Sequence, residues 1–285
     1  MSLGSMREMT TSNREPQKPI LDLSGPKLRA AFEALVRASE TIGGVERYAE
    51  ALKLKSQVFQ ERLAEGRAQT LERPDFEEMV LLMPTVRRRI GKPLADLGWP
   101  MMRNEIATLL TDAHVPGTGD QRMAAFCQSF PQTKDFRFTR DFAAEILHST
   151  LPEHYPLMTR WVWDSKANSG ALREIWHGDD VDHMLIDVPD NHEVFLVLRE
   201  ELSQFLSSNG IFRDMMWYVD LLVAQVYGDY VNAQGGAYLK TEFGSDSDPL
   251  EHSRRILGVD ARIAKRSGNV IDATAETSNA IKRIN

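Results

Sequence analysis

Cysteine, long apolar runs and excess positive charge are all scarce in this sequence. Its single cysteine, Cys127, cannot close an intrachain disulfide or build a thiolate cage for a metal. No apolar stretch approaches the ~20 residues that a membrane-spanning helix needs. A net charge of −7 and a pI of 5.6 argue against a general nucleic-acid coat. Because no secretory leader is recognisable either, we expect a protein of the reducing cytoplasm that does not span a membrane.

The apolar residues that are present recur mainly with the period of an α-helix. They make up 42% of 285 residues, enough for a sizeable core, and the clearest helical stripe covers residues 212–230. Alternating, strand-like patterns occur only at 136–138 and 181–188. The sequence therefore predicts an all-α fold, a multi-helix globular bundle with irregular connections and little or no sheet. The helix over 212–230 is expected to be its central buried element.

The polar ends of the chain divide it into a body and two extensions. Residues 1–19 are expected to be a disordered leader and 261–285 a loose C-terminal tail, because neither has a periodic apolar face. Residues 20–260 form the predicted helical body, with a possible lobe boundary at 90–100. The narrow apolar stripe of 45–64 predicts a helix at an edge of this body.

Capping and helix-breaking residues predict several helix ends. Pro84 is expected to split 75–90 into two short helices. Thr139 is a candidate N-cap, and Asp190 followed by Glu193 has the spacing of a capping box.

An unusual aromatic segment covers 147–164. Tyr155, Arg160, Trp161 and Trp163 are residue types that often anchor protein interfaces, and we predict that they bind a partner. The alternative is an irregular packed connection whose indoles cap the core. His148 belongs to the same segment, but no recognisable nucleophile accompanies it, so a core or surface histidine is the simpler interpretation.

Negative charge is concentrated between Glu174 and Glu201, a segment that contains nine acidic residues and one basic residue, Arg199. Asp179, Asp180 and Asp182 are the predicted partner-binding residues of this stretch, as a docking surface for a basic partner. Together with nearby histidines they could also hold a divalent ion. No EF-hand or HExxH spacing organises them, so no metal or cofactor is predicted.

A glycine-bearing turn at 114–120 resembles the hairpin of helix-hairpin-helix DNA-binding modules, which include DNA glycosylases. Gly117 and Gly119 would let backbone amides approach a phosphate. Thr118 stands where such hairpins carry an apolar residue, and Asp120 would place a carboxylate beside the phosphate. The simpler interpretation is a tight turn between two helices.

One basic cluster interrupts the acidic composition, in a predicted short helix. It consists of Arg87, Arg88, Arg89 and Lys92. Like charges on successive turns repel unless water or acidic partners surround them, so a solvent-exposed face is expected. A contact with phosphate or with a protein is the alternative.

Two segments resemble the nitrogenase-associated factor T type of accessory protein from nitrogen-fixation gene clusters. They are LHSTLPEHYPLMTRWVWDSKANSGALREIW, residues 147–176, and YVDLLVAQVYGDYVNAQGGAYLKTEFGSDSDPLEHSRRILGVD, residues 218–260. The resemblance covers about a quarter of the chain and carries over no site residues. It implies a cytoplasmic, non-catalytic helical protein that docks on a nitrogenase component during maturation, inactivation or repair.

These observations lead to one main hypothesis and two alternatives. The main hypothesis is a non-catalytic, chaperone-like accessory protein that docks on a protein partner, for which the resemblance suggests a nitrogenase component. One alternative is a helix-hairpin-helix protein that binds nucleic acid through the turn with Gly117 and Gly119. The other is an enzyme with a carboxylate and histidine metal site.

Overall fold

The computed structural model describes residues 19–40, 43–178, 180–234, 250–260, 263–264 and 270–271. It confirms the all-α fold. The α-helices are α1 (Gly25–Glu40), α2 (Glu46–Leu63), α3 (Arg73–Leu81), α4 (Pro84–Arg87), α5 (Gly91–Leu97), α6 (Trp99–Leu110), α7 (Gly119–Gln128), α8 (Thr139–Thr150), α9 (Ala171–Glu174), α10 (His192–Ser208), α11 (Met215–Gln234) and α13 (Glu251–Leu257). Short 3-10 helices occupy Arg67–Thr70, Lys134–Phe136 and Val181–His183.

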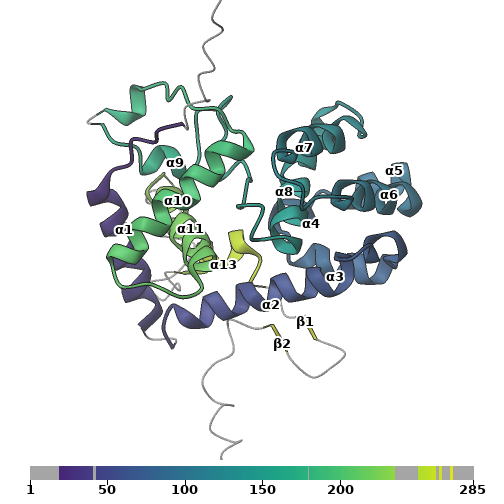
Figure 1. Ribbon diagram of the computed structural model, residues 1–285, viewed down its shortest axis with the longest axis horizontal. Helices are drawn as coiled ribbons and strands as arrows, with labels where there is room; N and C mark the ends of the chain where they lie inside the picture. The colour runs from purple at the N-terminus through teal and green to yellow at the C-terminus, as the bar shows by residue number, and fades with distance from the viewer. Residues whose placement is uncertain are drawn as a thin grey trace, which may run out of the picture.

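Figure 1 shows two groups of helices joined by α2. One group contains α1, α9, α10, α11 and α13, and the other contains α3 to α7. Helix α2 runs along the lower side of both groups, and α8 lies between them. The segment 90–100, where a lobe boundary is predicted, forms α5 and the start of α6 within the second group.

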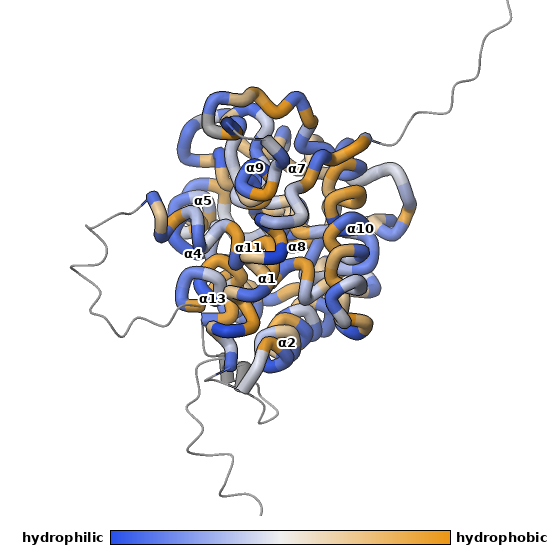
Figure 2. Tube along the Cα trace, turned by 90° about the vertical axis from the view of Figure 1, so that its left-hand side faces the viewer, coloured by the Kyte–Doolittle hydropathy of each residue, from blue (hydrophilic) through white to orange (hydrophobic). Residues whose placement is uncertain are grey.

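Helices α8 and α11 form the middle of the core. Every residue of α8 except Arg140 is buried, and eleven of the twenty residues of α11 are buried. Figure 2 shows both helices in the interior, with the other helices around them. The apolar stripe at 212–230 therefore predicts a central helix correctly, although the helix begins at Met215. The nearly complete burial of α8 is a feature that the sequence pattern does not reveal.

Proline and glycine fix several of the helix ends. Pro84 ends the preceding helix and becomes the first residue of α4, as predicted, because its ring cannot continue the hydrogen-bond ladder. Gly258 ends α13 with φ +72°, and a Cβ atom there would lie 2.0 Å from the Leu82 carbonyl oxygen. Glycine is therefore required where α13 meets the connection between α3 and α4.

Two predicted helix caps are wrong. The N-cap of α8 is Phe138, and the Thr139 hydroxyl instead donates to the Phe136 carbonyl at 2.9 Å. The N-cap of α10 is Asn191, whose Oδ1 accepts from the Val194 amide at 3.0 Å. Asp190 does not cap this helix because its carboxylate pairs with Arg140.

Three other expectations also differ from the structure. Helix α2 lies along one side of the body, as predicted, but its buried face is wider than the apolar stripe indicates: nine of its residues are buried, among them Lys55 and Ser56, which bond to polar groups of the core. The segments 136–138 and 181–188 contain 3-10 turns in place of strands. The strands that do form, β1 (Ile263–Ala264) and β2 (Val270–Ile271), pair antiparallel within the predicted tail. The predicted leader, apart from Pro19, lies outside the described residues, as does most of that tail.

Candidate functional site

The aromatic residues of 155–163 belong to the core, so the prediction that they form an exposed partner surface is wrong. Tyr155, Trp161 and Trp163 are buried. The Tyr155 hydroxyl donates to the Ala113 carbonyl, and the Trp163 indole N–H donates to the Val188 carbonyl at 3.0 Å. Each of these two rings therefore buries its body and satisfies its polar atom inside the protein, which is the packed-connection alternative.

Arg160 is half-buried and is held by one carboxylate. Its Nε and a terminal nitrogen donate to Asp141 Oδ2 at 3.0 and 2.6 Å, and its backbone amide donates to Asp141 Oδ1 at 2.9 Å. Three bonds to one carboxylate fix both the side chain and the backbone of this turn. Arg160 therefore joins the connection to α8 and is not a free interface anchor.

Asp141 is the first of three buried polar residues along α8, which we call the polar stripe. Asp141, Glu145 and His148 stand at positions i, i+4 and i+7, so they share one face of the helix. Each meets a partner from another part of the chain: Arg160 from the connection after α8, Lys55 from α2 and Asp220 from α11. The polar stripe therefore ties α8 to three neighbours.

The middle pair of the stripe is the most deeply buried. Lys55 Nζ lies 2.9 Å from Glu145 Oε2 and donates to the Leu257 carbonyl at 2.9 Å. Burial raises the pKa of Glu145 more than the ammonium of Lys55 lowers it, so the net pKa lies above the ordinary value. The pair connects α8, α2 and the end of α13.

His148 has an acceptor at each ring nitrogen. Its Nδ1 lies 2.8 Å from the Tyr155 carbonyl oxygen, and its Nε2 lies 2.9 Å from Asp220 Oδ2. Burial lowers the pKa of His148, but the Asp220 carboxylate and the Tyr155 carbonyl together raise it more, so the net pKa lies above the ordinary value. The site thus favours the imidazolium, which can donate to both acceptors.

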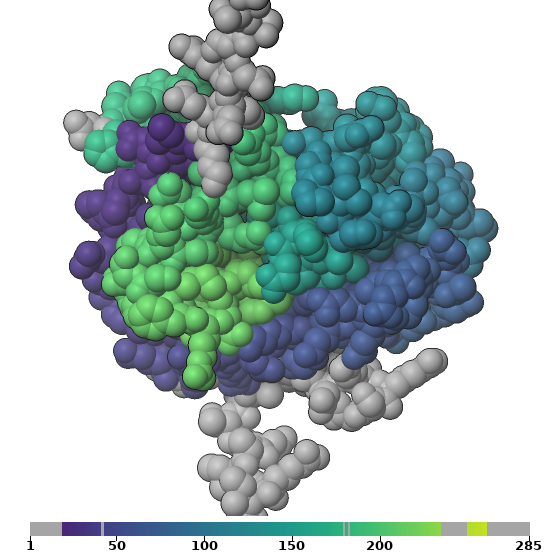
Figure 3. All heavy atoms as spheres, viewed as in Figure 1, coloured from purple at the N-terminus to yellow at the C-terminus, as the bar shows by residue number. Residues whose placement is uncertain are grey.

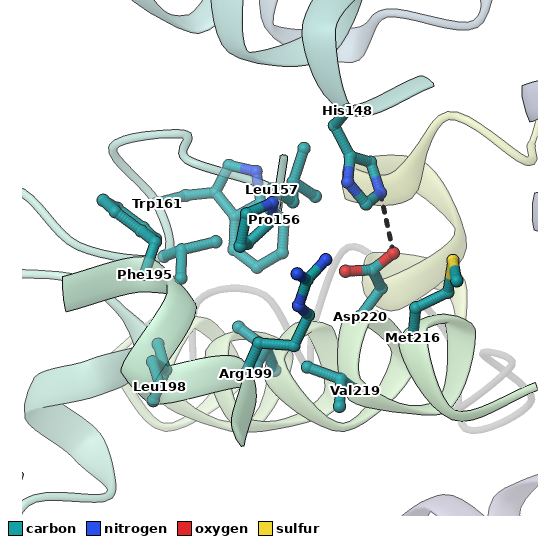
Figure 4. Close-up of a pocket in the computed structure, with 12 residues that line it drawn as sticks. His148, Pro156, Leu157, Trp161, Phe195, Leu198, Arg199, Met216, Val219 and Asp220 are labelled. Carbon is teal, nitrogen blue, oxygen red and sulfur yellow. Dashed lines mark hydrogen bonds and ion pairs between the residues drawn. The ribbon is translucent and has the colours of Figure 1, made fainter. Parts of the chain in front are cut away.

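Figure 4 shows a small cavity beside this pair, with the Arg199 guanidinium reaching toward Asp220. Arg199 also donates to the carbonyls of Pro152 and Glu153, at 2.8 and 2.9 Å. The cavity has room for about 20 Å³, which is one water molecule, whereas small-molecule sites usually measure roughly 300–1,000 Å³. In this geometry the pair organises the core and has no space for an organic substrate.

The acidic stretch is only partly within the described residues. Asp180 is exposed, and its Oδ1 lies 2.6 Å from Nδ1 of His183. Asp179 and the side chain of Asp182 lie outside the described part. Among the side chains that the structure does describe, no three His, Cys, Asp or Glu residues gather as a metal site.

Residues 180–190 are tied to the body at several points, and we call them the docking loop after the role predicted for their acids. Arg173 donates to the Val181 carbonyl at 3.1 Å, and Arg140 pairs with Asp190. The Asn168 side-chain amide donates to the Met184 carbonyl at 2.8 Å, and its Oδ1 accepts from the Ile186 amide at 3.1 Å. One side chain therefore holds the backbone on both sides of Leu185.

Leu185 itself points away from the protein. It is 78% exposed, and its neighbour Met184 is 39% exposed. Figure 3 shows the teal-green residues of this region at the upper-left edge of the molecule. Exposed single apolar residues are common, but here the backbone that carries one is fixed by hydrogen bonds. Sequence reasoning identified the acids of this loop and missed the leucine, whose position within an acidic stretch was the available signal.

A groove lies beside the docking loop, between α1, α9 and the end of α11. It measures about 590 Å³, and Asp180 and Val181 of the loop form part of its wall. Charged side chains of both signs line it, namely Lys27, Arg173, Glu174, Asp180 and Asp229. Burial raises the pKa of Asp229 more than the hydrogen bond from the Gln225 side chain lowers it. The net pKa of Asp229 therefore lies above its ordinary value.

The glycine-bearing turn joins α6 to α7 and packs against α10. Gly117 has φ +75°, which the turn requires, and a Cβ at Gly119 would lie 2.5 Å from Nδ1 of His192. The Asp120 carboxylate accepts from the His192 amide at 2.8 Å. The second glycine thus allows close contact with a protein side chain, and this position is not open to a phosphate.

The basic cluster is partly neutralised by carboxylates. Arg87 makes two bonds of 3.0 Å with Asp260, and Lys92 pairs with Asp135. Arg88 and Arg89 are exposed. The paired side chains of Arg87 and Lys92 therefore connect α4 and α5 to distant segments. Arg88 and Arg89 face solvent, as expected.

Comparison with known proteins gives no assignment for these features. No protein-family model, curated protein or solved structure matches the chain. Of the helices that the structure describes, none combines the length and apolarity needed to cross a membrane.

Proposed function

We propose that this chain is a non-catalytic accessory protein of the cytoplasm that docks on a protein partner through the docking loop. The observation that carries the proposal is Leu185, which is 78% exposed while Asn168 bonds the backbone on both sides of it. Burying a leucine side chain at an interface stabilises a complex by about 1.5–3 kcal/mol. Because the loop is already fixed, little conformational entropy is lost on binding.

Charge around the loop indicates the kind of partner. Asp180 and Asp187 within the loop are exposed, and so are Glu193, Glu200 and Glu201 along α10. Acidic groups around an apolar anchor favour a partner with an apolar pocket and a basic rim, since complementary potentials steer association and suppress wrong partners. The groove beside the loop provides further area for such a contact.

The resemblance of residues 147–176 to nitrogenase-associated factor T type proteins makes a nitrogenase component the first partner to test. This segment includes Trp163, Asn168 and Arg173, whose side chains all bond to carbonyls at 181–188. These three residues of the segment that carries the resemblance therefore position the docking loop, and they would not themselves contact the partner.

Pull-down from native extract tests the proposal with a matched pair of variants. Leu185→Ser removes the anchor, and Phe212→Ser removes an equally exposed side chain, 77%, beyond the far end of α10. A helix of 17 residues is about 25 Å long, so the control lies well away from the docking loop.

We expect one partner to be recovered with the wild type and with Phe212→Ser, and to be lost with Leu185→Ser. Mass spectrometry then decides whether it is a nitrogenase component. Equal recovery by all three proteins would remove Leu185 from the interface.

A further inference from the structure

A second cavity, called here the basic cavity, lies between α4, α11 and α13. It measures about 270 Å³. Its lining consists of Pro84, Thr85, Arg87, Arg88, Tyr227, Gly228, Val231, His252, Arg255 and Ile256. Three arginines and a histidine thus face one space without any carboxylate in the lining, although the chain as a whole carries a net charge of −7.

Two of these arginines form ion pairs with carboxylates that do not line the cavity. Asp260 holds Arg87 through two bonds of 3.0 Å, and Glu251 pairs with Arg255 one turn earlier on α13. The close contact of Gly258 with the Leu82 carbonyl also fixes α13 against the start of α4. The wall of the cavity is therefore preorganised, which lowers the entropic cost of binding.

Two of the remaining donors are not committed to other groups. Within the described part of the chain, the side chains of Arg88 and His252 make no hydrogen bond, and Arg88 is exposed. Tyr227 adds a hydroxyl group to the same lining, whereas the Thr85 hydroxyl already donates to Glu145 Oε1 at 3.5 Å. Arginine bonds phosphate oxygens through its planar fork, and a phosphate monoester offers several acceptor oxygens and up to two negative charges to such a set of donors.

We propose that the basic cavity binds a small phosphate monoester. Its volume lies just below the range of drug-sized pockets, which suits a ligand of a few heavy atoms beyond the phosphate. The phosphate lies between Arg88 and His252, with Arg87 and Arg255 providing positive potential from the fixed wall. This site is separate from the docking loop, and neither proposal depends on the other.

Isothermal titration of the full chain with glycerol 3-phosphate tests the site, with malonate as a carboxylate dianion for comparison. Arg88→Gln and His252→Gln remove uncommitted donors. Arg89→Gln is the matched control, because Arg89 is the exposed neighbour that does not line the cavity. Circular dichroism checks that each variant is folded.

We expect saturable binding of glycerol 3-phosphate, weaker by about tenfold in Arg88→Gln and in His252→Gln and unchanged in Arg89→Gln. Malonate should bind at least tenfold more weakly than the phosphate. Three results would each overturn the proposal: no binding to the wild type, equal weakening by all three substitutions, or equal affinity for malonate.

Discussion

The polar stripe of α8 and the docking loop depart from ordinary burial in opposite directions. The stripe places Asp141, Glu145 and His148 inside the core, and the loop places Leu185 in solvent. Both departures are held by specific hydrogen bonds, from Arg160, Lys55 and Asp220 in the core and from Asn168 at the loop. They differ in that every charge of the stripe has a charged partner within the chain, whereas most of the Leu185 side chain is left in solvent by the residues that the structure describes.

This difference separates a structural role from a binding role. A buried charge with an internal partner contributes to the unique arrangement of helices, and its loss is costly because the remaining charge stays buried. An exposed apolar side chain on a fixed backbone contributes nothing to the isolated fold. The comparison therefore predicts large changes in stability for the stripe, and changes in binding alone for Leu185.

The largest effect is expected at the middle of the stripe. Glu145→Ala leaves the Lys55 ammonium buried without its carboxylate, so the free energy of unfolding should fall by about 3–5 kcal/mol. Replacing both residues together, Lys55→Met with Glu145→Leu, should recover most of that loss. Urea denaturation followed by circular dichroism measures both variants. A single variant as stable as the wild type would show that the pair does not organise the core.

The next effect is a pH dependence at His148. Its folded-state pKa is raised above the ordinary 6.5, so the folded protein binds more protons than the unfolded chain. Its contribution to stability is full below pH 6.5 and is lost as the pH rises through the folded-state pKa. The slope should not exceed about 1.4 kcal/mol per pH unit.

Asp220→Asn removes the main cause of that raised pKa and should flatten the dependence. His154→Gln, at an exposed histidine, is the control and should leave it unchanged. Thermal or urea unfolding between pH 6 and 9 checks both variants. Identical profiles in wild type and Asp220→Asn would contradict the role given to the pair.

A smaller effect is expected at Asn168, which connects the loop to the body. Its φ is +48°, which glycine adopts readily, so Asn168→Gly keeps the backbone conformation while it removes the side chain that carries both hydrogen bonds. Global stability should fall by about 1–2 kcal/mol. Amide hydrogen exchange at Ile186 should accelerate, because its N–H donates to Asn168 Oδ1. Unchanged exchange at Ile186 would show that this bond does not fix the loop.

The smallest effect on stability is expected at Leu185. Leu185→Ser should change the free energy of unfolding by no more than about 0.5 kcal/mol, since the side chain has few contacts to lose. The same urea titration used for Glu145→Ala provides the comparison. A loss above 2 kcal/mol would mean that Leu185 packs against the body, and the contrast between the two regions would fail.

How far the sequence predicts this structure depends on the element. Apolar periodicity was sufficient for α11, and proline chemistry for the break before α4, because both depend on local backbone rules. The burial of Trp161 and Trp163 depends on which distant segments cover them, and composition does not contain that information.

The two regions that matter most had only partial signals in the sequence. The spacing of Asp141, Glu145 and His148 marks one helix face, but their partners come from α2, from α11 and from the connection after α8. The acidic composition of the docking loop was visible in the sequence. The two hydrogen bonds by which Asn168 fixes the loop are tertiary contacts, which the sequence does not show. Local patterns thus identified the acidic stretch, and only the fold shows that Asp141, Glu145 and His148 lie in the core while Leu185 reaches solvent.

Site-specific photo-crosslinking in the cells that carry the gene tests the central claim most directly. A benzophenone amino acid replaces Leu185 in one version of the protein, and Leu81, an exposed residue at the end of α3, in the other. Docking through the loop predicts a light-dependent adduct of defined mass from position 185 and none from position 81. No adduct at 185, or the same adducts from both positions, would contradict it.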